Sequence, residues 1–128
     1  MTRCRSNNKK IGTAYEKEVV DLLSSYGYWS HRFEEDKRGA QPFDVIAVKN
    51  GIAYAIDAKT LDKKDHIFYL NRLEDNQITA FNHWIRCGNS RPRVFVKWHD
   101  ETYVLDYLTL KENGKIDMYT AETFTGEL

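Results

Sequence analysis

Two apolar runs, residues 43–49 and 52–60, flank the dipeptide Asn50-Gly51, and this arrangement constrains the fold more than any other part of the chain. Asn-Gly is a preferred pair for a two-residue type I′ turn, because both central positions of that turn need a positive φ angle. Such a turn fixes the register, so that the last residue before it faces the first residue after it. The sequence therefore predicts a tight β-hairpin of known alignment.

The same alignment brings two acidic residues together at the far end of the hairpin. Asp44 is expected opposite Asp57, and directly opposed residues have Cβ atoms about 4.5–5.5 Å apart. Because both strands are otherwise apolar, these carboxylates are expected at the end of a buried sheet, where they need a cation or a shared proton. With no Cys or His in the hairpin, the hard ions Mg²⁺ and Mn²⁺ are favoured over zinc.

A lysine follows the second acid on the same strand face. Lys59 lies two residues after Asp57, and alternate side chains of a strand point to the same side. An ammonium group at this place could hold an attacking water or stabilise charge on a phosphate. The alternative is a salt bridge that only neutralises the acids. An isolated Asp-x-Lys has little meaning, whereas one in register with a second Asp is far less common.

Helical patterns lie on both sides of this hairpin. Residues 12–26 and 71–86 repeat apolar side chains at helical spacing, and residues 28–33 form a possible short strand. Residues 94–98 and 102–106 form a second predicted strand pair. The order of elements predicts an α/β domain with a central mixed β-sheet flanked by helices. Residues 107–128 have no clear pattern.

Composition restricts the chain to one ordinary globular domain. Its 128 residues are 41% hydrophobic and 13% aromatic, which is too apolar for a disordered chain. No run approaches the roughly 20 apolar residues of a membrane span, and the N-terminus lacks the apolar segment of a secretory signal. Two widely separated cysteines are typical of a reducing compartment, so we expect a cytoplasmic protein. Residues 11–128 are expected to form the domain, and residues 1–10 a flexible basic arm.

Charge is balanced overall but unevenly distributed. Of 19 acids and 19 bases, seven acids and only two bases lie in residues 100–128, so the rest of the chain has a net charge of +5. The first ten residues have no acid and four bases: Arg3, Arg5, Lys9 and Lys10. A basic arm of this kind suits a polyanionic partner, although a solvated terminus would have the same composition.

The hairpin and the two helical segments resemble those of a known family. The stretch FDVIAVKNGIAYAIDAKT, residues 43–60, resembles the core motif of the PD-(D/E)xK nucleases, in which an acid, a hairpin and an acid-x-Lys follow one another. Residues 11–28 and 73–84 resemble the first and second helices of Holliday-junction resolvases of the Hjc and RecU types. The resemblance implies a restriction-endonuclease-like core with helices on both sides of a mixed sheet.

The resemblance also implies a metal site and a reaction. The enzymes of this family hydrolyse DNA phosphodiesters with Mg²⁺, for which Mn²⁺ can substitute. By this resemblance, Asp44 and Asp57 are metal ligands, with the Ala58 carbonyl as a further ligand. Glu16 would complete the site directly or through a water. From its pattern alone, a role in the capping box of the first helix or as a surface charge is slightly favoured.

Two further side chains and a set of DNA contacts follow from the same resemblance. Lys59 would orient the nucleophile, and Gln77 would position Lys59 or a phosphate. The partner would be branched DNA, a four-way junction that a twofold homodimer cuts symmetrically. Residues expected to contact phosphates are Arg3, Arg5, Lys9, Lys10, Lys37, Arg38, Lys63 and Lys64. Another nuclease with the same scaffold and an inactive DNA-binding module are the alternatives.

Overall fold

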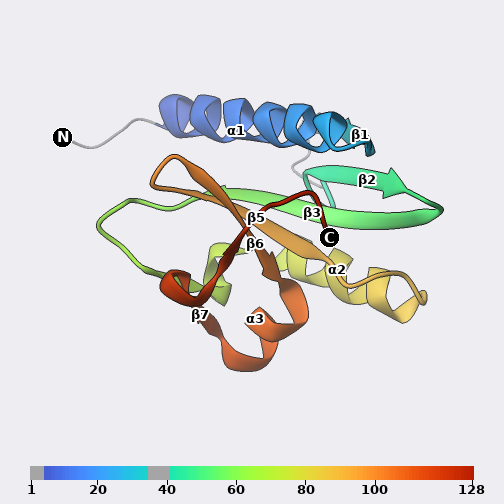
Figure 1. Ribbon diagram of the computed structural model, residues 1–128. Helices are drawn as coiled ribbons and strands as arrows, with labels where there is room; N and C mark the ends of the chain where they lie inside the picture. Colours follow the sequence, from blue (N-terminus) through green and yellow to red (C-terminus); the bar gives the residue numbers. More distant parts are fainter. Residues whose placement is uncertain (1–4, 35–40) are drawn as a thin grey trace.

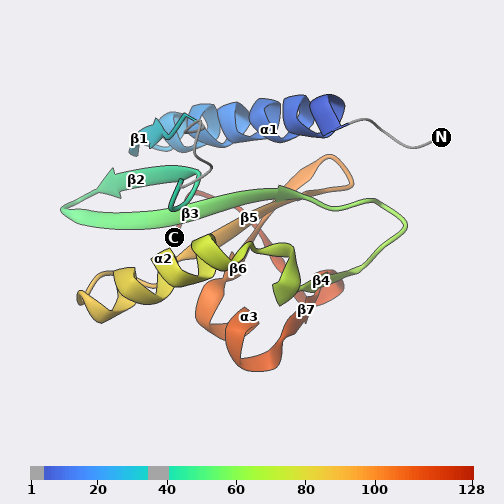
Figure 2. The same ribbon diagram turned by 180° about the vertical axis from the view of Figure 1, so that it is seen from behind.

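A computed structural model describes the backbone of residues 5–34 and 41–128, and the side chains from Lys10 onward. Helix α1 covers one face of a central sheet, and helices α2 and α3 cover the other face (Figure 1). Figure 2 shows the second face, where α2 lies beside the small β4–β7 sheet. The helices are α1 (Arg5–Ser25), α2 (Asp75–Arg86) and α3 (Tyr107–Asn113), with 3₁₀ turns η1 (Leu70–Arg72) and η2 (Met118–Thr120).

The central sheet has six strands in the order β1-β2-β3-β5-β6-β8. Its strands are β1 (Trp29–Arg32), β2 (Val45–Lys49), β3 (Ile52–Thr60), β5 (Arg93–Trp98), β6 (Glu101–Asp106) and β8 (Glu122–Thr123), and the small sheet pairs β4 (Ile67–Tyr69) with β7 (Lys115–Asp117). Strands β3 and β5 pair in parallel, whereas the other neighbours are antiparallel. The predicted mixed sheet between helices is therefore confirmed.

The predicted hairpin register is also confirmed. Lys49 pairs with Ile52, and the ladder continues without a break to Val45 opposite Ile56. Asn50 has a φ of 53° and Gly51 a φ of 78°, the two positive values that a type I′ turn requires.

The ladder changes one residue earlier, at Asp44. The Asp44 N–H donates to the carbonyl oxygen of Ile56 at 3.1 Å, although Ile56 is already the partner of Val45. Two residues of one strand thus face a single residue of the other, which is a β-bulge. Asp44 therefore lies diagonal to Asp57, not directly opposite as predicted. Bulges redirect side chains, and this one determines the position of the first acid.

Two cores fill the space on either side of the sheet. The α1-side core consists of one face of α1, including Tyr15, Val19 and Leu23, packed on Ile56 and Phe95. The α2-side core is larger and is made by these buried residues: Phe43, Ala55, Phe68, Leu73, Phe81, Val94, Val96, Trp98, Leu105, Tyr107, Leu110 and Met118. Because β3 is buried on both faces, any polar side chain on it must find a partner within the protein.

The helix boundaries differ from their predictions at the N-terminal ends. Helix α1 begins at Arg5, before the predicted start at Gly12, so residues 5–10 of the expected flexible arm have helical backbone. Helix α2 begins at Asp75 because the residues before it form η1, whose end is followed by the extended Leu73 and Glu74. Among the described residues, no helix has the length and apolar character needed to cross a bilayer.

Residues 107–128, whose sequence predicts no element, complete both faces of the molecule. Asp106 caps α3 by accepting from the Thr109 N–H, and Gly114 ends α3 with a φ of 77°. The chain then forms β7, η2 and β8 and returns to the α1-side core. There, Phe124 packs on Tyr28, and the Tyr28 hydroxyl donates to the Gly126 carbonyl oxygen at 2.9 Å.

Candidate active site

Asp44 is held where β2 leaves the ladder. In an unbroken ladder the Ala58 N–H would pair with the backbone of residue 43. Here it donates to Asp44 Oδ2 at 2.8 Å, and the Gln41 side-chain amide donates to Asp44 Oδ1 at 2.8 Å. Asp44 is only 5% exposed, and each of its carboxylate oxygens accepts one of these hydrogen bonds. The bulge therefore replaces a backbone acceptor by a carboxylate that points into the site.

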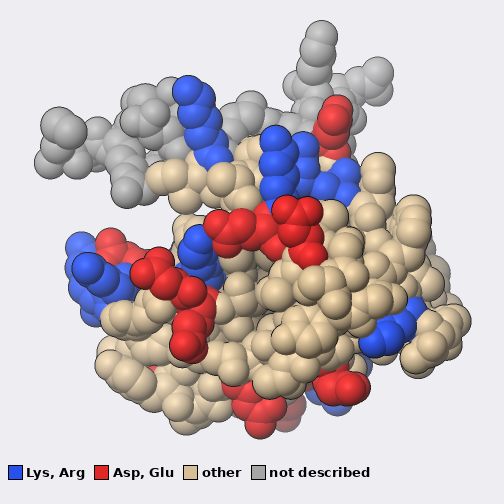
Figure 3. All heavy atoms as spheres, turned by 45° about the horizontal axis from the view of Figure 1, so that its top comes forward, with Lys and Arg blue, Asp and Glu red and all other residues tan. Residues whose placement is uncertain are grey.

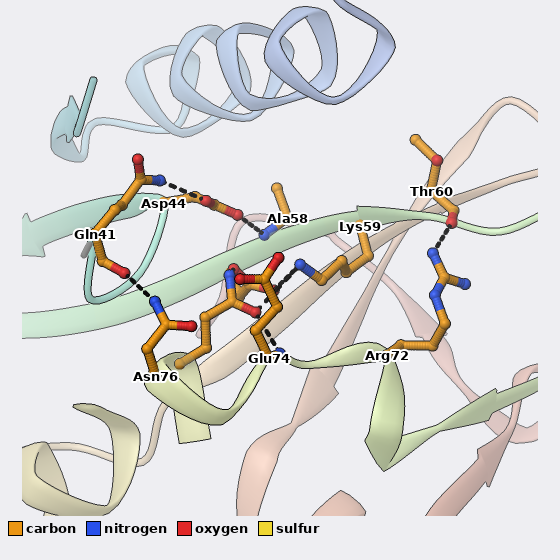
Figure 4. A network of polar contacts seen from close by, with 10 residues as sticks. Gln41, Asp44, Ala58, Lys59, Thr60, Arg72, Glu74 and Asn76 are labelled. Carbon is orange, nitrogen blue, oxygen red and sulfur yellow. Dashed lines mark hydrogen bonds and ion pairs between the residues drawn. The ribbon is translucent and has the colours of Figure 1, made fainter. Parts of the chain in front are cut away.

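Asp57 lies on β3 and is bound from two directions. The Gln77 amide nitrogen Nε2 donates to Asp57 Oδ1 at 2.7 Å, and Lys59 Nζ lies 3.0 Å from Asp57 Oδ2. Lys59 Nζ also donates to Gln77 Oε1 at 3.3 Å, which closes a triangle of three side chains. Figure 4 shows Lys59 reaching from β3 toward the first turn of α2. The structure thus brings together Asp57, Lys59 and Gln77, three of the candidate site residues.

Burial gives Asp57 unusual electrostatics. Its side chain is fully buried, and this desolvation raises the pKa of Asp57 well above its ordinary value. The adjacent Asp44 carboxylate raises that pKa further, whereas Lys59 lowers it. Asp57 Oδ2 forms an ion pair with Lys59 Nζ at 3.0 Å, and among the described residues no further donor reaches this oxygen. A buried carboxylate oxygen with spare acceptor capacity is suited to a cation.

Glu16 approaches the site from α1. Arg32 Nη1 on β1 lies 3.6 Å from Glu16 Oε1, which is too far for a hydrogen bond. Desolvation, reinforced by the Asp44 carboxylate, raises the pKa of Glu16 to about 7, and Arg32 opposes this shift. Asp44 is thus near enough to influence Glu16 electrostatically, but no hydrogen bond joins the two.

The residues present fit a hard divalent cation in part. Asp44 and Asp57 supply carboxylate oxygens of the type that Mg²⁺ and Mn²⁺ bind, and Asp57 Oδ2 is buried without a hydrogen bond. Within the described residues, however, no three His, Cys, Asp or Glu side chains are grouped closely enough to hold a metal ion. The predicted role of Glu16 as a third ligand therefore needs a change in its side-chain position or an intervening water.

The predicted DNA-contacting residues are only partly described. Lys10, Lys63 and Lys64 are exposed, the latter two in the loop between β3 and β4. Arg5 and Lys9 lie in the first turns of α1, where the structure describes the backbone alone, and Arg3, Lys37 and Arg38 lie outside the described residues. Figure 3 shows acidic and basic side chains interleaved among the described residues of the face that it presents.

Sequence reasoning missed three polar residues that surround the site. Gln41 bonds to Asp44, Asn76 bonds to Gln41, and Arg32 faces Glu16. Gln41 and Asn76 have no distinguishing pattern, because loop and helix residues that meet across 35 positions are brought together only by the tertiary fold. Arg32 carried no signal either, because the other residues of its short strand include the polar Ser30 and His31.

Comparison with known proteins assigns the chain to a family. A family model of the archaeal Holliday junction resolvases (Hjc) matches residues 7–127. The chain belongs to this family. No curated protein matches the chain. Among solved structures, the Hjc of Archaeoglobus fulgidus, a Holliday junction resolvase from an archaeal hyperthermophile, has 19% identity and a TM-score of 0.63.

The structural similarity extends over most of both proteins. It covers 83% of this chain and 86% of the Archaeoglobus Hjc. At this identity the comparison establishes the shared fold, and the family match provides the assignment to the resolvases. Both agree with the resemblance seen in the hairpin motif, and they confirm the restriction-endonuclease-like fold.

Proposed function

We propose that this chain is a Mg²⁺-dependent endonuclease that resolves four-way DNA junctions by paired symmetric cuts. The class of activity follows from membership of the Hjc family. The observation that carries the mechanism is the cluster of Asp44, Asp57, Lys59 and Gln77 at the bulged end of the β2–β3 hairpin. The bulge places Asp44, strand β3 carries Asp57 and Lys59, and the first turn of α2 adds Gln77.

Each side chain has a distinct role in this proposal. Asp44 and Asp57 would hold the ion, with the Ala58 carbonyl as a further ligand. When bound, Mg²⁺ would polarise the scissile phosphate and lower the pKa of an attacking water. Lys59 is held against Asp57, where its ammonium can orient that water and stabilise charge that develops on the phosphate. Gln77 fixes both neighbours, because its amide nitrogen donates to Asp57 and its amide oxygen accepts from Lys59.

Glu16 would act as a general base or as a ligand through water. Its raised pKa of about 7 means that it exchanges a proton near neutral pH. Groups with a pKa near the working pH are the most effective at moving protons. Arg32, beside it, would keep part of Glu16 ionised or contact a phosphate itself.

A cleavage assay tests this proposal. End-labelled four-way junction and linear duplex of the same sequence are incubated with the protein in Mg²⁺ or in EDTA. We expect paired nicks at symmetric positions of the junction in Mg²⁺ and none in EDTA. Equal cutting of the linear duplex would instead indicate another nuclease on the same scaffold. Tight junction binding without cutting would indicate an inactive DNA-binding module.

Two further properties belong to the same proposal. Symmetric cutting of two strands requires two active sites, so we propose a twofold homodimer on the junction. Sedimentation of the protein with and without junction tests this proposal. A protein that stays monomeric on the junction and still cuts both strands symmetrically would contradict it. We also propose a cytoplasmic location, which agrees with the exposed free thiol of Cys87.

A further inference from the structure

The first turn of α2 contacts both acidic residues of the site through neighbouring positions. Gln77 donates directly to Asp57 Oδ1 at 2.7 Å. Asn76, the preceding residue, donates from Nδ2 to the Gln41 carbonyl oxygen at 2.8 Å. The Gln41 side chain in turn donates to Asp44 Oδ1 at 2.8 Å (Figure 4). One helical turn thus has a direct connection to Asp57 and an indirect connection to Asp44.

We propose that Asn76 and Gln41 are positioning residues that set the place and orientation of Asp44 relative to Asp57. Together with Gln77, they tie both carboxylates to the start of α2. This inference rests on the proposed function in one respect, since it takes these two carboxylates to be the ion-binding pair. Neither Asn76 nor Gln41 would touch the DNA or the reacting atoms.

The need for such a tether follows from the bulge. The regular ladder ends at Val45, so the pairing that fixes Asp57 on β3 does not extend to Asp44. The Ala58 N–H binds only one of the two Asp44 oxygens. The Gln41 amide binds the other, and Asn76 prevents the loop that carries Gln41 from moving away from α2. Hydrogen-bonded outer residues of this kind orient the ligands of metal sites.

These bonds leave the carboxylates able to bind an ion. An ionised carboxylate has about four acceptor positions, and Asp44 uses two of them in the contacts described. Asp57 likewise keeps its buried Oδ2 without a hydrogen bond. The tether therefore orients the acids without competing with the ion.

The start of α2 is itself rigidly attached to the sheet. The Glu74 N–H donates to Gln77 Oε1 at 3.0 Å, so the same amide that binds Asp57 also caps the helix. Just before α2, Arg72 Nη2 donates to the Thr60 carbonyl oxygen at 2.7 Å, near the end of β3. A fixed helix start makes Asn76 a suitable anchor for the loop.

The test measures metal binding and catalysis in separate experiments. Gln41→Met keeps the length of the side chain and removes its donor, and Asn76→Ala removes the anchor. We expect the Kd for Mn²⁺, measured by calorimetry on the protein alone, to rise about 10-fold in each variant. Cleavage of the junction should show a lower kcat with an unchanged KM, which distinguishes a positioning role from a contact with DNA.

Two controls accompany these variants. Asn89→Ala removes an exposed amide at the opposite end of α2 and should leave Mn²⁺ affinity and kcat at the parental values. The double variant Gln41→Met/Asn76→Ala should bind Mn²⁺ no more weakly than Gln41→Met, because the two residues act in series. Circular dichroism confirms that each variant is folded.

The outcomes separate this inference from the proposed function. Parental Mn²⁺ affinity in Gln41→Met and Asn76→Ala would overturn the inference, and a multiplied loss in the double variant would overturn the serial arrangement. A parental protein that binds Mn²⁺ but leaves junctions uncut would contradict the proposed function, while the Mn²⁺ comparison still decides the inference. A parental protein that binds no Mn²⁺ would overturn both.

Discussion

The two sides of the active site differ in how closely their side chains are held by neighbouring groups. On the α2 side, Asp57, Lys59 and Gln77 form a closed triangle with contacts of 2.7–3.3 Å. On the α1 side, the contact of Glu16 among the described residues is an ion pair with Arg32 at 3.6 Å. The α2 side is therefore fixed before any ligand arrives, whereas Glu16 has freedom to change its partner.

This difference has a physical cause in the chain. Asp57 and Lys59 share a strand whose register is fixed by a two-residue turn, and α2 packs directly beneath that strand. Glu16 lies on helix α1, which contacts the sheet through the apolar α1-side core. The position of Glu16 therefore depends on non-directional apolar packing. The comparison indicates that ion binding depends on the α2 side and that proton transfer is adjusted on the α1 side.

The largest effect is expected from the fixed side. Asp57→Asn removes a carboxylate from the ion site, and we expect the rate of junction cleavage to fall about 10³-fold or more. Junction affinity should stay at the parental value, because Asp57 is fully buried and cannot contact a phosphate directly. Band-shift titration and single-turnover cleavage measure the two quantities. Cleavage at the parental rate would show that the site has been assigned to the wrong residues.

The sequence predicted the α2 side well for the same reason. Asp57 and Lys59 share a strand face because they are two residues apart, which is local information, whereas Gln77 was expected only from the family resemblance. The bulge at Asp44 was not predictable, because it depends on how the loop before β2 is tied to α2. Nor was the position of Glu16 beside Arg32, since it depends on how α1 packs over β1. The sequence also predicted no secondary structure for residues 107–128, because the short elements there are stabilised mainly by tertiary contacts.

A second change tests how the fixed side tolerates its buried charge. Lys59→Met removes the cation from Asp57, and breaking a buried ion pair costs about 3–5 kcal/mol. The pKa of Asp57 is higher in the folded protein than in the unfolded chain. The free energy of unfolding therefore falls progressively as the pH rises from the unfolded pKa toward the folded pKa. The loss in Lys59→Met should therefore be larger at pH 8 than at pH 5. Urea unfolding at both pH values, in EDTA, measures it.

A lysine on the other face of the sheet provides the control for this experiment. Lys97 pairs with the exposed Glu18 of α1 at 2.9 Å. Exposed pairs contribute about 0–1 kcal/mol, so Lys97→Met should lower stability little and equally at both pH values. A loss in Lys59→Met that is independent of pH would contradict the assignment of the buried charge to Asp57.

The adjustable side should have a smaller effect that is visible mainly through pH. The pKa of Glu16 is raised from 4.5 to about 7, so the folded protein holds this proton over that range while the unfolded chain releases it. Stability should therefore fall as pH rises from about 4.5 to about 7, and Glu16→Gln should remove that part of the fall. Urea midpoints from pH 4 to pH 8 in EDTA measure the difference, with Glu18→Gln as the exposed control.

Removal of Arg32 makes the smallest and most specific change. Arg32 lowers the pKa of Glu16 by its charge and by its contact, so Arg32→Ala should move the Glu16 titration to a pH above 7. Carbon-13 NMR of the Glu16 carboxyl follows that titration directly, and Arg72→Ala, whose guanidinium binds the Thr60 carbonyl oxygen, is the control. An unchanged Glu16 titration would mean that burial and Asp44 alone set its pKa. Arg32 would then have no part in setting the Glu16 proton equilibrium, and the inference that the α1 side adjusts proton transfer through this pair would not hold.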